Sequence, residues 1–153
     1  MSDQNRLAQE NAAMRQQLAQ RSRSLQDAEA RYDAVFNSAL NLLSVCTTEG
    51  VILDVNAATL RAVGLTIEAF VGKHVWESPW FAENPDEAVK IEAAITKRRG
   101  QYMEYESAVL ARNGDWRVFR FILRPYRSHV GSDARFLILE VLDITGIAKT
   151  IRP

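Results

Sequence analysis

Residues 42–64 read LLSVCTTEGVILDVNAATLRAVG, and this stretch decides the fold of the chain. Two short apolar runs, residues 42–46 and 51–55, flank a polar turn in which Gly50 can take a positive φ. So short a connection allows only antiparallel pairing of the two runs. Asn56 follows in a position to cap a short helix. The stretch therefore predicts a β-hairpin that leads directly into a helix.

The composition indicates one soluble globular domain with some chain to spare. Of 153 residues, 47% are apolar and 25% are charged, and 19 basic side chains balance 19 acidic ones. No net charge therefore attracts nucleic acid or an anionic membrane surface. The single cysteine, Cys46, excludes an internal disulfide and a cysteine-cluster metal site. No apolar run approaches the roughly 20 residues of a membrane span, and no signal-peptide core is present, so we interpret the chain as cytoplasmic.

The first 38 residues contain no glycine or proline and are rich in helix-forming residues. Spacings of three and four residues define a heptad seam over more than four repeats, which is typical of a coiled coil. A polar Asn11 in such a seam fixes register and favours a parallel two-stranded homodimer. The alternative is a single amphipathic helix that folds back onto its own domain. The expected dimerisation residues are Leu7, Asn11, Met14, Leu18, Leu25 and Tyr32.

After the hairpin, the sequence predicts helices followed by three strands. Thr66 can cap a short helix over residues 67–71, and Asn84 precedes a longer helix over residues 85–99. Acidic residues open this longer helix, and Lys97, Arg98 and Arg99 are expected in its last turn, where they would match the helix dipole. The Asn113-Gly114 pair predicts a tight hairpin turn. Strands are expected at residues 101–111, 116–124 and 135–143.

The last of these strands is apolar at nearly every position between Phe136 and Leu142. A strand that is apolar on both faces is covered on both faces. One face would close the domain core. The element left to cover the other is the leading helix, either that of the same chain or that of a partner.

The order of these elements resembles that of a PAS domain, and the resemblance covers residues 32–146. Its landmarks are Asn56 after the second strand, Gly72-Lys73 after the short helices, Asn113-Gly114, Pro125 at the end of the fourth strand, and Asp143-Ile144-Thr145 at the end of the fifth. The aromatic and proline-containing stretch at residues 75–81 resembles one found in PAS sensors of bacterial histidine kinases, including some that bind small aromatic compounds.

The resemblance implies an α+β fold, a five-stranded antiparallel sheet with helices on one face that encloses a small-molecule pocket. Residues 1–38 would form the dimerisation helix, residues 39–146 the PAS domain and residues 147–153 a linker stub. Asp143 and Thr145 would mark the signal junction to an output domain absent from this chain, such as a two-component histidine kinase. The competing hypothesis is a ligand-free PAS domain that serves as a dimerisation or docking scaffold.

The sequence disfavours several PAS cofactors and gives no sign of enzyme chemistry. The region where photoactive flavin members carry a reactive cysteine, residues 71–83, contains none, and the long helix lacks the histidine that many haem-binding members use. Cys46 is interpreted as a small buried apolar side chain, and His74 and His129 as loop residues without a metal. Non-covalent flavin or a small aromatic ligand remains open. No Gly-rich phosphate loop, Ser-His-Asp order or metal-binding cluster is present.

Two groups of side chains are candidates for the pocket wall. Aromatic rings in the region between the helices could stack on a flat ligand, and alternate residues of the third and fourth strands point inward. Each could equally fill the core. The candidates are Trp76, Trp80, Phe81, Met103, Tyr105, Phe119 and Phe121. The opening hairpin itself is expected to act as a joint between the leading helix and the sheet rather than as a ligand-binding motif.

Overall fold

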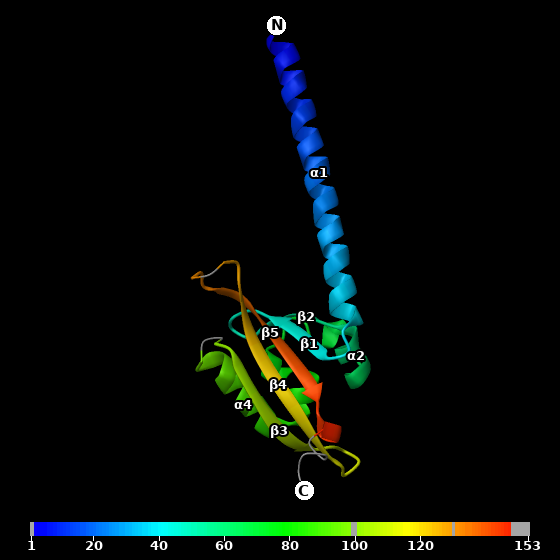
Figure 1. Cartoon of the computed structure of the whole chain (residues 1–153), viewed down its shortest axis with the longest axis vertical. Coiled ribbons are helices and arrows are strands. Elements are labelled where there is room, and N and C mark those ends of the chain that lie inside the picture. Colours follow the sequence, from blue (N-terminus) through cyan, green and yellow to red (C-terminus); the bar gives the residue numbers. More distant parts are fainter. Residues whose placement is uncertain (1, 99–100, 130, 148–153) are drawn as a thin grey trace. The chain divides into compact units, whose positions relative to one another are not determined.

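The computed structural model describes residues 2–98, 101–129 and 131–147 (Figure 1). The chain divides into two compact units, residues 1–37 and residues 38–153, and each is described by itself. The elements are α1 (Asp3–Ser38), β1 (Leu42–Cys46), β2 (Ile52–Val55), α2 (Ala57–Val63), the 3-10 turns η1 (Ile67–Ala69) and η2 (Val75–Glu77), α3 (Pro79–Glu83), α4 (Pro85–Thr96), β3 (Met103–Leu110), β4 (Trp116–Arg127) and β5 (Ala134–Asp143).

The first unit is the single 36-residue helix α1. The predicted N-terminal helix is therefore present. Its apolar seam faces solvent in the single chain, with Leu18 65% and Leu25 60% exposed. Near the end of the helix, Tyr32 stacks on Phe36 with ring centroids 5.1 Å apart. No described helix is both long and apolar enough to cross a membrane.

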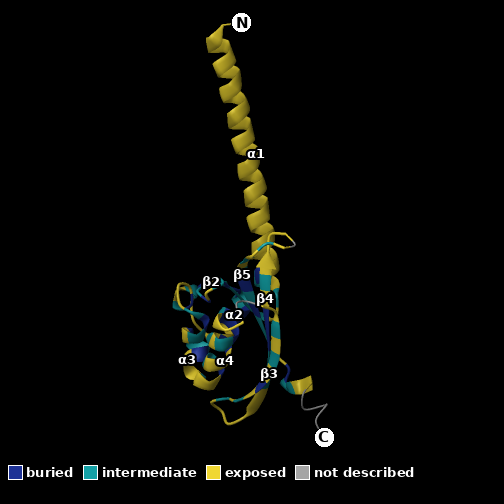
Figure 2. Cartoon of the chain, turned by 90° about the vertical axis from the view of Figure 1, so that its left-hand side faces the viewer, coloured by how far each residue is buried: buried dark blue, intermediate teal, exposed yellow. Residues whose placement is uncertain are grey.

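The second unit is built on a five-stranded sheet with the order β2-β1-β5-β4-β3, in which every neighbouring pair is antiparallel. The opening hairpin, β1 with β2, forms one edge, and the β3–β4 hairpin forms the other. Helices α2, α3 and α4 gather on one side of the sheet (Figure 2). The predicted α+β fold with helices on one face is confirmed.

Asn56 ties the hairpin to α2 and is fully buried. Its side-chain oxygen accepts hydrogen bonds from the backbone N–H of Leu43 (3.0 Å) and from the backbone N–H (3.2 Å) and hydroxyl (2.8 Å) of Thr59. Its side-chain nitrogen donates to the carbonyl oxygen of Asn41 at 2.9 Å. One side chain thus caps α2, as the sequence predicts, and also fixes the start of β1. Gly64 ends α2 in the left-handed conformation, with φ 76°.

The core lies between the sheet and the helices. Side chains of the inward phase, among them Leu123, Leu137 and Leu139, pack against Ile91 and Ile95 of α4. Cys46 belongs to this cluster and is 0% exposed. Burial raises the pKa of its thiol to about 12, so the thiol stays protonated at neutral pH and behaves as an apolar group.

Three local predictions were wrong. The helix expected at residues 67–71 is only the 3-10 turn η1, and Thr66 makes no side-chain cap there. Helix α4 ends at Thr96, with Lys97 as its C-cap, so the basic run is not its last turn. The chain must reverse there before β3 begins. Arg99 lies outside the described residues.

Pro125 does not end β4, which continues to Arg127. The β3 ladder on one side of β4 stops at the pair Met103–Leu123, while pairing with β5 continues through Pro125–Leu137. Pro125 therefore lies where one side of β4 is an edge, and a proline without an N–H is tolerated in such a place.

The face of the sheet that points away from the helices combines apolar side chains and ion pairs. Ile122 is 8% exposed on this face, and Tyr126 stacks on Phe136 at 4.7 Å. Arg120 pairs with Glu106 at 2.8 Å, and Arg124 pairs with Glu140 at 3.3 Å. That a helix covers this face stays a prediction.

Among the glycines in the described ranges, Gly50 has the tightest surroundings, and we expect its replacement to be costly. Its φ is 91°, and a Cβ there would lie 2.7 Å from Cζ3 of Trp76. Gly50→Ala should lower the free energy of unfolding by about 2 to 3 kcal/mol, because backbone strain and overpacking add. Gly72→Ala is the matched control, since Gly72 has φ 87° but open space around it. Equal losses in urea titrations of the two variants would show that the Trp76 contact is unimportant.

Candidate functional site

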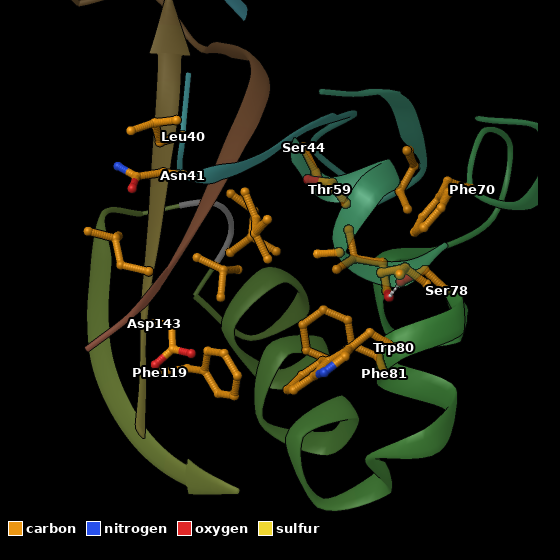
Figure 3. A pocket seen from close by; sticks show the side chains of 18 of the residues that line it. Leu40, Asn41, Ser44, Thr59, Phe70, Ser78, Trp80, Phe81, Phe119 and Asp143 are labelled. Carbon is orange, nitrogen blue, oxygen red and sulfur yellow. Dashed lines mark hydrogen bonds between the residues drawn. The ribbon is translucent and has the colours of Figure 1, made fainter. Parts of the chain in front are cut away.

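A cavity of about 610 Å³ lies between the inner face of the sheet and the helices (Figure 3). Its walls come from β1, β4 and β5 on the sheet side and from α2, η2 and α3 on the helix side. Volumes of this size are typical of small-molecule sites, which are mostly apolar with a few polar groups. The cavity is therefore the candidate ligand site of the second unit.

An aromatic group forms one wall of the cavity. Pro79 occupies the first turn of α3, and the next two residues, Trp80 and Phe81, both reach the cavity. Their rings meet edge to face with centroids 5.0 Å apart, and Trp80 meets Phe119 of β4 in the same way at 5.6 Å. Such a wall can stack on a flat apolar ligand or meet it edge-on.

The sheet supplies the opposite wall. The registers Ser44–Leu139 and Leu42–Val141 place these four side chains on the inner face, and all four line the cavity. Helix α2 adds Thr59 and Val63, which share one face because they are four residues apart. The wall is apolar except for the hydroxyls of Ser44 and Thr59.

The cavity opens where the chain enters and leaves the domain. Leu40, just before β1, is 90% exposed, and it lines the cavity together with Asn41. Arg117 of β4 and Asp143 at the end of β5 lie at the same opening and form an ion pair at 2.9 Å. The other Asp143 oxygen accepts hydrogen bonds from the backbone N–H and the hydroxyl of Thr145.

Asp143 is held in its charged form. Partial burial raises the pKa of its carboxyl group, but the hydrogen bonds from Thr145 and the charge of Arg117 lower it more, so the pKa lies below its ordinary value. The Arg117–Asp143–Thr145 connection therefore persists throughout the neutral pH range.

The structure brings only some of the predicted pocket residues to the cavity. Trp80, Phe81 and Phe119 line it. Phe121 lies in the core at 1% exposure, with Tyr105 stacked on it at 4.9 Å, and Met103 packs against the same core. Trp76 stacks on His74 at 4.6 Å. These last four predicted residues are not among the cavity-lining side chains.

The cavity wall contributed by β1 and α2 was not predicted as a binding site. The signal for it is present in the sequence, because Leu42, Ser44 and Cys46 alternate along β1 with an inward phase. What the phase does not reveal is that the space opposite Leu42 and Ser44 is open, whereas Cys46 is packed. Among the described residues, no group of three His, Cys, Asp or Glu side chains could hold a metal ion.

Comparisons with known proteins agree with this fold. A family model described as the PAS fold matches residues 36–148. A sensor histidine kinase, TmoS of Ectopseudomonas mendocina, is 26% identical over 121 residues, which are 75% of this chain but only 12% of that protein. The chain thus spans about one eighth of the length of this relative.

Solved structures of PAS domains have the same fold at low identity. The PAS domain of Bordetella pertussis BvgS matches with a TM-score of 0.64 and 22% identity, covering 82% of this chain and 93% of that one. The PAS domain of an HTR-like protein from Haloarcula marismortui matches with a TM-score of 0.59 and 18% identity, covering 82% and 99%. From the family match over most of its length and from its sheet order, we conclude that this chain belongs to the PAS family.

Proposed function

We propose that this chain is the sensor module of a larger signalling system. It binds a small, largely apolar aromatic ligand in the cavity and passes the state of the cavity through its flanking segments to an output domain. The similarity to a sensor histidine kinase supports an output of that class. The long exposed seam of α1 supports a homodimer in which the two helices pair through Leu7, Asn11, Met14, Leu18, Leu25 and Tyr32.

One observation supports the proposal that the state of the cavity is passed to the flanking segments. The opening of the cavity is formed by residues 40–42, which follow α1 in the sequence, and by Leu142 and Asp143, which precede the exit from the domain. The cavity that a ligand would occupy therefore borders both connections. Because Asp143 also holds Thr145, any shift of the ion pair with Arg117 is passed to the segment that leaves the sheet. We assign the signal junction to Asp143 and Thr145 on this basis.

The walls favour a ring-shaped ligand. Trp80, Phe81 and Phe119 offer aromatic surfaces from one side, and Leu139 and Val141 offer a smooth aliphatic surface from the other. A single aromatic ring fits between such surfaces and makes favourable contacts with both. The arrangement resembles a binding site more than a packed core because the space between the walls is not filled by side chains.

The direct test is thermal stability of the full chain with single-ring probes. A ligand that binds only the folded state at one hundred times its Kd stabilises the protein by about 2.7 kcal/mol. Either p-xylene or p-cresol at saturation should therefore raise the Tm by several degrees. The variant Val63→Trp, which fills the cavity from α2, should abolish the shift.

The control for that variant is Val89→Trp, the same substitution at a position on α4 that is 67% exposed and not among the cavity-lining residues. It should retain the full shift. If neither probe nor a broader set of aromatic compounds changes the Tm, and native mass spectrometry finds no carried molecule, the domain is a ligand-free scaffold.

A further inference from the structure

Ser44 stands out among the polar side chains of the cavity. It lies in the middle of β1, between β2 and β5, and its cross-strand neighbours Val55 and Leu139 are each only 2% exposed. Its side chain points into the cavity (Figure 3). Its hydroxyl has no hydrogen-bond partner within the described part of the chain. Ser44 is half-buried, so its hydroxyl is accessible to a molecule in the cavity that can supply a partner.

Apart from the indole N–H of Trp80, which can only donate, the other polar side chains around the cavity already make hydrogen bonds or ion pairs. Thr59 donates to Asn56 at 2.8 Å, and Ser78 donates to the carbonyl oxygen of Val75 at 2.6 Å. At the opening, Asn41 donates to Glu140 at 2.7 Å, and Arg117 pairs with Asp143 at 2.9 Å. Ser44 is thus the one cavity hydroxyl, among the described residues, whose O–H is not already donated within the chain.

We propose that Ser44 is the polar anchor of the ligand, and that the ligand is a neutral, single-ring aromatic compound with one hydrogen-bonding substituent, such as a phenol. This inference rests on the proposed function of the cavity as a ligand site. The ring lies against Trp80, Phe81 and Phe119, and its substituent exchanges a hydrogen bond with the Ser44 hydroxyl. The serine hydroxyl can donate or accept, so a phenolic hydroxyl or a ring carbonyl both fit.

Charge and hydrogen-bonding capacity narrow the ligand class. The charges at the opening cancel in the Arg117–Asp143 pair, and no charged side chain lines the cavity beside Ser44, so an ionised ligand would be buried without a counterion. A flavin ring carries several donors and acceptors along one edge. The Ser44 hydroxyl and the indole N–H of Trp80 cannot satisfy them all, and leaving such groups unpaired in an apolar site is unfavourable.

The proposed hydrogen bond from Ser44 to the ligand should appear as a difference in affinity between two compounds of equal size. The compounds p-cresol and p-xylene differ by a hydroxyl in place of a methyl group. Calorimetric titration of the full chain should show p-cresol binding about tenfold more tightly, the difference expected from one neutral hydrogen bond. In Ser44→Ala, p-cresol should lose that tenfold advantage while p-xylene binds at least as tightly as before.

The binding results distinguish three claims: the role of Ser44, the function of the cavity as a ligand site and the neutral charge of the ligand. Equal binding of both probes to the unaltered protein, or a p-cresol preference that survives in Ser44→Ala, overturns the role of Ser44 and leaves the cavity as a ligand site. Binding of neither probe overturns the proposed function itself. Tighter binding of benzoate than of p-cresol overturns the neutral ligand class.

Two further variants serve as a control and as an alternative to Ser44→Ala. Ser132→Ala removes a serine from a surface loop outside the cavity and should bind both probes like the unaltered protein. If Ser44→Ala fails to fold, Ser44→Cys keeps the size of the side chain with a much weaker donor. It should show the same loss of preference, and a full tenfold preference in it would also overturn the proposal.

Discussion

Replacing Asn56 with alanine should lower the free energy of unfolding by about 3 kcal/mol. The variant leaves the backbone N–H groups of Leu43 and Thr59 and the carbonyl oxygen of Asn41 without their partner. Each buried group left unsatisfied costs about 1 to 3 kcal/mol, and the helix cap is lost as well. For a domain of this size the Tm should fall by roughly 10 °C or more. Equilibrium unfolding in urea measures the loss.

Asn41→Ala is the matched control for that experiment. Asn41 is exposed, and its side chain bonds the partly buried carboxylate of Glu140, while its backbone carbonyl stays available to Asn56. It should cost less than about 1 kcal/mol, as surface substitutions usually do. Similar losses in the two variants would mean that Asn56 is not the connection between hairpin and helix that its hydrogen bonds indicate.

The double variant Leu18→Glu with Leu25→Glu should convert the proposed dimer to a monomer. Both leucines lie on the α1 seam and are 65% and 60% exposed in the single chain. In a parallel coil they would be buried against the partner helix, and four buried carboxylates in one seam cannot be accommodated. Sedimentation at tens of micromolar should show a dimer for the unaltered chain and a monomer for the variant.

Gln16→Glu with Gln26→Glu adds the same charge to α1 at positions away from the seam and should remain dimeric. The two double variants separate the effect of the seam from the effect of added charge on a long helix. An unaltered chain that sediments as a monomer, or seam and off-seam variants that behave alike, would remove the basis for pairing through α1.

Local signals allowed much of the fold to be predicted from the sequence. Asn56 and Gly64 mark the two ends of α2, and Asn113-Gly114 marks the β3–β4 turn, because each of these residues satisfies a backbone requirement of its own neighbourhood. The same reasoning failed at Thr66 and Pro125. Thr66 precedes only a short 3-10 turn and makes no side-chain cap. At Pro125 the outcome depends on a distant segment, because the β3 ladder ends before it.

The cavity was harder to predict than the fold. Residue phase shows which side chains point inward, so Phe119 and Phe121 were equivalent candidates from the sequence. In the structure Phe121 is 1% exposed within the core, while Phe119 borders open space. The difference is set by packing across the domain, because Tyr105 and Phe81 pack against Phe121 in addition to Trp80, which contacts both rings, and no local pattern encodes it.

The strand order has a consequence for how the domain is made. The last strand in the sequence, β5, occupies the centre of the sheet, between β1 and β4. The pair Leu42–Val141 joins residues from opposite ends of the domain, so its loop-closure entropy is overcome late in folding. During synthesis, the opening hairpin and the β3–β4 hairpin each keep an unpaired strand edge until β5 has been synthesised. We therefore expect the nascent chain to remain open to aggregation until residue 143 has left the ribosomal tunnel, and to complete its sheet in one step afterwards.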